Sequence, residues 1–118
     1  MSEQSESAGA QAQNEGGAYR EWSAILDLMP GGSDPRKLRV GGEYRLNRRS
    51  GTVQLRKRVP QGFIPETLLL DLVIEGSGPG GDWVAVEEEF EATQGQYEEV
   101  RVQDENGEEV VLKVQEVH

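Results

Sequence analysis

The sequence contains no cysteine and a single histidine, His118, at its last position. Without cysteine the chain forms no disulfide and has no thiolate for catalysis or metal binding. A lone histidine at a frayed chain end is not held in place as a general base, so the sequence argues against a Ser–His nucleophile or one of the usual zinc ligand sets. We therefore expect a protein that is not an enzyme and that carries no cofactor.

Long apolar runs are also absent, and lysine is scarce. No stretch approaches the length of a membrane-spanning helix, and the first residues lack the basic and then apolar pattern of a signal peptide. Only three of the twelve basic residues are lysine, and the formal net charge is −10. Such an acidic surface disfavours contact with nucleic acid and with anionic lipid. We expect a soluble, cytoplasmic protein that does not bind membranes and for which nucleic acid is a disfavoured partner.

Large apolar side chains are missing from the first part of the chain. Residues 1–18 contain none after Met1, so they cannot bury enough surface to offset the entropy of ordering. The sequence predicts a disordered acidic and polar tail over residues 1–18. Residues 19–118 are then long enough for a single domain with a modest core.

The most apolar stretch of the chain, residues 67–75, reads as the strand around which the domain is organised. Leu68, Leu70, Leu72 and Ile74 alternate along it, while further apolar residues occupy the opposite face. Prolines precede the stretch and a glycine-rich segment follows it, which limits it to a strand. A strand that is apolar on both faces is typical of the interior of a sheet.

Six further segments alternate apolar and polar residues and end at turn-forming residues. The predicted strands cover residues 19–28, 37–46, 52–58, 83–92, 97–103 and 109–117. Between the third and fourth strands, Phe63 and Ile64 are expected to plug the edge of the core. The fold class is therefore all-β: a single antiparallel sandwich of immunoglobulin type, or a partly open barrel, with about seven strands.

Two hairpin registers follow from the same alternation. Pairing Leu46 with Val53 would keep the apolar residues of the second and third strands on one face. For the last two strands, a three-residue loop over residues 105–107 pairs Val102 with Val110, and gives Gly107 the left-handed backbone that such loops require.

Basic residues are concentrated between residues 36 and 58, which contain nine of them and only one acid, Glu43. This asymmetry is the one functional lead in the composition. It predicts either an anion-binding hairpin or ion pairs with outward glutamates such as Glu87 and Glu89 of a neighbouring strand, and we favour the ion pairs. The candidate binding residues are Arg39, Arg45, Arg48, Arg49, Arg56 and Arg58.

Two single residues stand out in the strand pattern. Asp71 interrupts the apolar fourth strand, which indicates either a catalytic acid or, as we favour, a structural pair with an arginine. Trp83 falls on the same face as the glutamates rather than on the apolar face. The acidic runs near residues 87–91 and 104–108 lack the spacing of a calcium loop, so we interpret them as solvated surface.

The string from Pro60 to Leu72, after the segment from Leu38 to Glu43, resembles small uncharacterised bacterial all-β proteins. The likeness extends over residues 22–117, and its distinctive part is Pro60-Gln61-Gly62 to Leu70-Asp71-Leu72. It implies a standalone single-domain protein, and it brings no activity and no site. Our functional prediction is a non-enzymatic module that binds a protein, or a second copy of itself, at a sheet edge. The alternatives are an anion or nucleic-acid binder and, third, an enzyme or a small-ligand-binding barrel.

Overall fold

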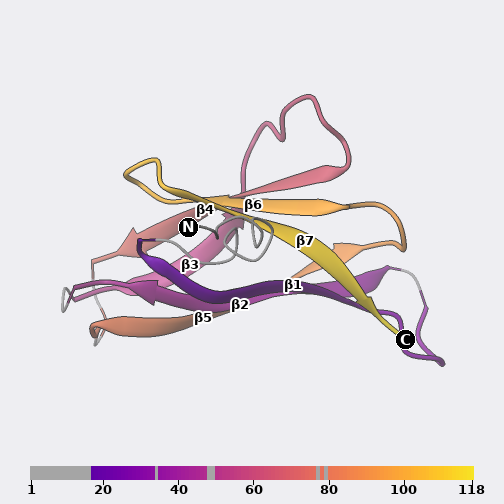
Figure 1. Ribbon diagram of the computed structural model, residues 1–118, viewed down its shortest axis with the longest axis horizontal. Coiled ribbons are helices and arrows are strands. Elements are labelled where there is room, and N and C mark those ends of the chain that lie inside the picture. The colour runs from indigo at the N-terminus through magenta and orange to yellow at the C-terminus, as the bar shows by residue number, and fades with distance from the viewer. Residues whose placement is uncertain (1–16, 34, 48–49, 77, 79) are drawn as a thin grey trace, which may run out of the picture.

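The computed structural model describes residues 17–33, 35–47, 50–76, 78 and 80–118. These residues form seven strands and no helix (Figure 1). Three predicted strands match the observed bounds, and the other four differ by one or two residues at one or both ends. The strands are β1 (Tyr19–Asp27), β2 (Arg36–Arg45), β3 (Thr52–Lys57), β4 (Thr67–Glu75), β5 (Trp83–Ala92), β6 (Glu99–Gln103) and β7 (Glu109–Val117).

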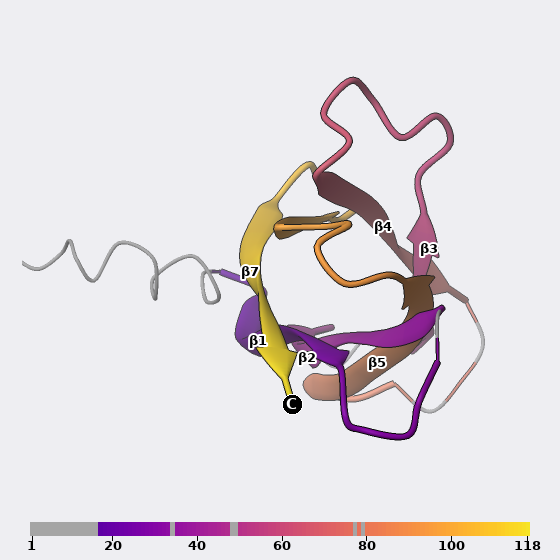
Figure 2. The same cartoon turned by 90° about the vertical axis from the view of Figure 1, so that its right-hand side faces the viewer.

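All seven strands belong to one sheet with the order β3-β4-β6-β7-β1-β2-β5. The sheet curls until its two edge strands, β3 and β5, lie close together, so the fold is nearly closed and barrel-like (Figure 2). The expectation of a wholly antiparallel sheet is wrong, because β1 pairs with β7 and β4 pairs with β6 in parallel. Between β4 and β6 the chain crosses to the far edge as β5, and it returns to the same end of the sheet before β6 begins.

The core fills the interior of the curled sheet, and period-two alternation identifies its members. Most side chains that the pattern assigns to the inner face are buried, whereas their sequence neighbours are half-buried or exposed. The strand predicted to organise the domain, β4, has neighbours on both sides and supplies three fully enclosed leucines. The largest fully buried side chains are Trp22, Tyr19, Leu38, Leu68, Leu70, Leu72, Val40, Val100 and Val102.

A bulge in β1 places both Tyr19 and Trp22 in the core although they are three residues apart. Glu21 has a φ of 58°, and the register between β1 and β2 shifts by one residue there. Opposite the bulge, the Trp22 ring lies where a side chain of Gly42 would be. Gly42 thus allows the close approach of the Trp22 ring that the bulge in β1 creates.

The predicted pairing of the second and third strands is wrong. Both edges of β2 are occupied, by β1 and β5, while β3 pairs with β4. Tyr44 therefore lies between Tyr19 and Val84 and has no paired neighbour on β3. Alternation of apolar and polar residues determines which face of a strand is buried. It does not determine which strands pair, because every strand of this sheet has the same alternation.

The register of the last hairpin is confirmed. Val100 pairs with Leu112 and Val102 with Val110, as the three-residue loop requires. Gly107 has a φ of +87°, and its N–H donates to the carbonyl of Asp104 at 3.1 Å. This hairpin joins β6 and β7, and so links the two halves of the sheet.

The start of the domain includes Gly17 and Ala18 from the predicted tail. Ala18 is attached to the sheet by two hydrogen bonds. The N–H of Ala18 donates to a carboxylate oxygen of Glu108 at 3.1 Å, and its carbonyl accepts from the N–H of Arg45 at 2.9 Å. Residues 1–16 lie outside the described residues, so a disordered tail there stays a prediction.

Candidate interaction surface

The structure separates the arginines that the sequence places in one hairpin. Arg39 and Arg45 lie on β2, between β1 and β5, whereas Arg56 lies on β3 and Arg58 directly follows it. No common hairpin face gathers these four side chains, because β2 and β3 are not neighbours in the sheet. The remaining candidates, which lie outside the described residues, are Arg48 and Arg49.

On β2 the arginines face acids of the neighbouring edge strand. Arg39 Nε lies 3.3 Å from a carboxylate oxygen of Glu87 and 3.8 Å from one of Glu89. Arg45 Nε lies 3.9 Å from Asp82, just before β5. The favoured interpretation, cross-strand pairing with outward glutamates, is confirmed for Arg39. Exposed pairs of this kind contribute about 0–1 kcal/mol each.

Arg56 of β3 and Arg58, which follows it, are also paired with acids of β4. Arg56 lies 2.9 Å from Glu75, and Arg58 Nε donates to Asp71 at 2.9 Å. Arg58 also donates to the side-chain oxygen of Gln103 at 2.9 Å. Asp71 is half-buried and has the arginine partner that the structural interpretation predicts, so the pairing we favoured is confirmed.

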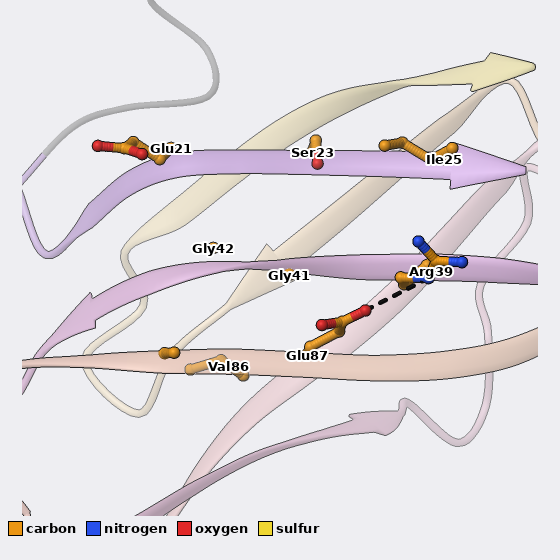
Figure 3. Close-up of a pocket in the computed structure, with 9 residues that line it drawn as sticks. Glu21, Ser23, Ile25, Arg39, Gly41, Gly42, Val86 and Glu87 are labelled. Carbon is orange, nitrogen blue, oxygen red and sulfur yellow. Dashed lines mark ion pairs between the residues drawn. The ribbon is translucent and has the colours of Figure 1, made fainter. Parts of the chain in front are cut away.

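A shallow depression of about 340 Å³ lies on the outer face of β1, β2 and β5 (Figure 3). Gly41 and Gly42 form part of its lining, and so does the Arg39–Glu87 ion pair. Ser23 is the only hydroxyl in the lining. The chain's one histidine, His118, lies instead beside Glu116 at the end of β7. The depression therefore places no histidine beside this hydroxyl, and the carboxylates in its lining are those of Glu21 and Glu87.

Trp83 lies on the outer face, as the pattern indicates, and it is covered by a residue that the sequence analysis missed. The guanidinium carbon of Arg20 lies 4.0 Å from the centroid of the Trp83 ring, and that of Arg45 lies 5.9 Å away. Arg20 also donates to Glu43 at 2.6 Å. Both guanidinium groups therefore make cation–π contacts with the Trp83 ring within the fold. Finding Arg20 from sequence would require the β1–β2 register.

A buried polar network closes one end of the core and was also missed. Asp104 accepts a hydrogen bond from the Tyr44 hydroxyl at 2.8 Å and from the N–H groups of Asn106 and Glu108 at 2.9 Å each. The Tyr19 hydroxyl donates to the carbonyl of Glu108 at 2.9 Å. Burial, and then the nearby Asp104 carboxylate, raise the pKa of Tyr19. The Asp-x-Asn-Gly string is the sequence signal for the turn part of this network.

The feature that the sequence analysis placed wrongly is the connection between β3 and β4, residues 58–66, which we call the arm. It projects away from the curled sheet in both views (Figures 1 and 2). Phe63 is 102% exposed, Val59 90% and Ile64 61%. Phe63 and Ile64 therefore do not plug the core. β4 and its neighbours already fill the interior, so apolar character alone did not predict burial.

The side chain of Gln61 fixes the arm to β4. Its amide nitrogen donates to the carbonyls of Arg58 at 2.7 Å and Leu69 at 2.8 Å, and its amide oxygen accepts from the N–H of Leu69 at 2.9 Å. The N–H of Arg58 still donates to the carbonyl of Leu69 at 3.0 Å, and the Gln61 amide bridges the other half of this pair, the Arg58 carbonyl and the Leu69 N–H. The N–H of Thr67 also donates to the carbonyl of Ile64 at 3.1 Å. The arm is therefore held in place at its base.

A largely apolar groove of about 300 Å³ lies between the arm and the outer face of β4 and β6. Half-buried Leu69 contributes to its lining, and Arg101 lies at its polar side. A hydrogen bond and the charge of Glu99 raise the pKa of Arg101, so its charge is already balanced within the fold. The lining residues are Gln61, Phe63, Ile64, Thr67, Leu69 and Arg101.

Neither a metal-binding cluster nor a membrane-spanning helix occurs among the described residues. No group of three or more His, Asp or Glu side chains there is placed to hold a metal ion. No helix in the described part of the chain has the length and apolar character needed to cross a bilayer. Comparison with protein-family models, curated protein sequences and solved structures yields no match to this chain.

Proposed function

We propose that this protein is a non-enzymatic binding module that contacts a protein partner through the apolar arm and the adjoining groove. One observation carries the proposal. Five large apolar side chains in the described part of the chain are exposed, and three of them, Val59, Phe63 and Ile64, lie within six consecutive residues of the arm. Clustered exposed apolar residues mark interaction sites, whereas scattered ones are ordinary.

The fixed base of the arm supports the same proposal. Binding is weakened by the entropy lost when a mobile segment becomes ordered, so a segment ordered beforehand binds more tightly. The three hydrogen bonds of Gln61 hold the arm against Leu69 before any partner arrives. Aromatic residues presented in this way are typical binding hot spots.

Strand addition at a sheet edge is a second route to a protein partner, and it has weaker support. The edge strands β3 and β5 lie close together, which leaves little room for another strand between them. Half-buried Glu88 lies between Val86 and Phe90 in the alternation of β5. An inward-facing charge on an edge strand opposes the docking of further strands.

Anion or nucleic-acid binding through the arginines is the less favoured candidate. Arg39, Arg56 and Arg58 each have an acidic partner within the fold, and the chain carries a net charge of −10. An anion would have to displace those acids. A polyanion titrated at low salt should accordingly produce no chemical-shift changes around these residues at millimolar concentration.

Two further features are part of the same proposal. We infer a partly open barrel rather than an immunoglobulin-like sandwich, since the ladder continues through all seven strands in one order. We also infer a cytoplasmic location, because a small domain without cysteine has no need of an oxidising compartment.

Site-specific photo-crosslinking tests the proposed contact. A benzophenone amino acid is placed at position 63 in one variant and, as a matched control, at position 29 in another. Met29 is also an exposed apolar loop residue, at 51%, but it lies outside the arm. In native extract, position 63 should form a discrete adduct that excess unlabelled protein competes away, whereas position 29 should not.

A second variant distinguishes a specific contact from non-specific adsorption. Gln61→Ala in the position 63 variant should reduce the adduct, because the arm loses its attachment to β4. Equal adduct patterns from positions 63 and 29, or an adduct that excess unlabelled protein does not reduce, would refute the arm as a binding surface.

A further inference from the structure

We propose that the partner at the arm is a second copy of this chain, with Phe63 of each copy seated in the groove of the other. This inference rests on the proposed function of the arm and names its occupant. The exposed Phe63 side chain and the groove that it borders lie on the same face of one molecule.

Self-complementarity favours a second copy over an unrelated protein. A two-fold axis beside the arm would place Phe63 of the first copy in the groove of the second, and Phe63 of the second copy in the groove of the first. This reciprocal contact is the requirement for a closed isologous dimer. The groove has the matching chemistry, since Ile64 and Leu69 present apolar surface and Gln61 is already occupied by backbone partners. No further polar group is needed from the entering side chain.

Charge favours the same face for self-association. The chain has a net charge of −10, so two copies repel each other over most of their surfaces. The segment from β3 to β4, residues 52–75, is an exception because its three basic residues balance its three acidic ones. The same neutrality gives this face no attraction for an anionic bilayer. The six residues are Arg56, Lys57, Arg58, Glu66, Asp71 and Glu75.

The available apolar area suits a weak, concentration-dependent dimer. An exposed phenylalanine presents roughly 200 Å², and adding Val59 and Ile64 brings each arm to on the order of 400 Å². Two arms together give about 800 Å², and contact with Leu69 and the flanking prolines adds to this. Specific interfaces of about 1,200 Å² lie at the small end of the known range. We therefore expect dissociation in the micromolar range.

Sedimentation equilibrium of the purified full-length protein tests the dimer. Phe63→Ser occurs twice in each dimer, so it should raise the dissociation constant about 100-fold, while the exposed control Met29→Ser should leave it unchanged. Because Phe63 is fully exposed, its replacement should not alter the melting temperature of the monomer.

Mixing two defective variants tests the exchange itself. Phe63→Ser removes the plug, and Leu69→Arg obstructs the groove. A mixed dimer combines one chain with an intact Phe63 and one whose groove keeps Leu69 and lacks only its own Phe63, so the mixture should associate at least tenfold more tightly than either variant alone. Circular dichroism checks that Leu69→Arg remains folded; if it does not, the less disruptive Leu69→Gln replaces it.

Three outcomes would overturn the second copy as occupant. These are a protein that stays monomeric at millimolar concentration, unchanged association of Phe63→Ser, and Phe63-dependent co-sedimentation of the monomer with phosphatidylcholine–phosphatidylglycerol vesicles. A monomer that still forms a competable adduct with a different polypeptide at position 63 would refute the dimer and leave the proposed function standing.

Discussion

Replacing Gly42 with alanine tests the packing between β1 and β2 directly. A Cβ built on Gly42 would lie 2.5 Å from Cδ1 and 2.7 Å from Cδ2 of the Trp22 ring, far inside van der Waals contact. Trp22 is only 1% exposed, and its ring nitrogen donates to the carbonyl of Glu43 at 2.7 Å. The ring therefore cannot move aside without disturbing the core and this hydrogen bond.

The expected cost follows from these contacts. Overpacking a well-packed core costs about 1–3 kcal/mol, and weakening the Trp22 hydrogen bond adds about 1 kcal/mol. We expect Gly42→Ala to lower the free energy of unfolding by about 2–4 kcal/mol. For a domain of this size a loss of about 2 kcal/mol lowers the melting temperature by roughly 8–16 °C. Urea unfolding followed by far-ultraviolet circular dichroism measures the difference.

Gly76→Ala is the matched control, because a Cβ there meets no atom within 4 Å. It should change stability by less than about 0.5 kcal/mol. The double variant Trp22→Leu/Gly42→Ala should be less destabilised than the sum of the two single changes, since the smaller side chain leaves room for the added methyl group. If Gly42→Ala unfolds at the same urea concentration as Gly76→Ala, the packing described here is wrong.

Three further predictions concern single residues. Gly107→Ala, which forces a side chain into the left-handed region, should cost about 1 kcal/mol in urea unfolding, and an unchanged midpoint would contradict the positive φ. The raised pKa of Tyr19 gives stability that is present below about pH 10 and lost above it, because the unfolded tyrosine ionises there first. Urea unfolding between about pH 9.5 and 11.5 should therefore show a shallower pH dependence for Tyr19→Phe, by up to about 1.4 kcal/mol per pH unit, and equal slopes would contradict this assignment. Asp71→Asn should cost less than about 1 kcal/mol, since the pair with Arg58 is partly solvated, and a loss of several kcal/mol would show that the carboxylate does more than pair.

The strands and their buried faces could be predicted from sequence because both depend on local alternation. Leu68, Leu70 and Leu72 alternate along β4, and the same rule located the last hairpin through Val100 and Val102. Strand neighbours could not be predicted in this way. The β2–β3 pairing failed because β1 and β5 satisfy the edges of β2 equally well.

The candidate surface was predicted only in part, because only some of its features follow from local alternation. Cross-strand pairing of Arg39 with Glu87 and Glu89 followed from charge excess and alternation. The arm did not, because an apolar residue in a connection is buried only if the core has space for it. The core has no space for Phe63, because side chains of β4 and its neighbours fill it. The residues around Phe63 in the sequence give no sign of this.

The position of β7 has a consequence for how the chain folds. β7 is the only strand in the observed order that joins β3-β4-β6 to β1-β2-β5, and its parallel pairing sets Ala24 against Val114, ninety residues away. During synthesis the interior between β1-β2-β5 and β3-β4-β6 therefore cannot be enclosed until β7 has been made. Such high contact order slows folding and lengthens the time that unpaired strands stay exposed. The net charge of −10 acts over the same interval, because incomplete chains of like charge repel one another until β7 is in place.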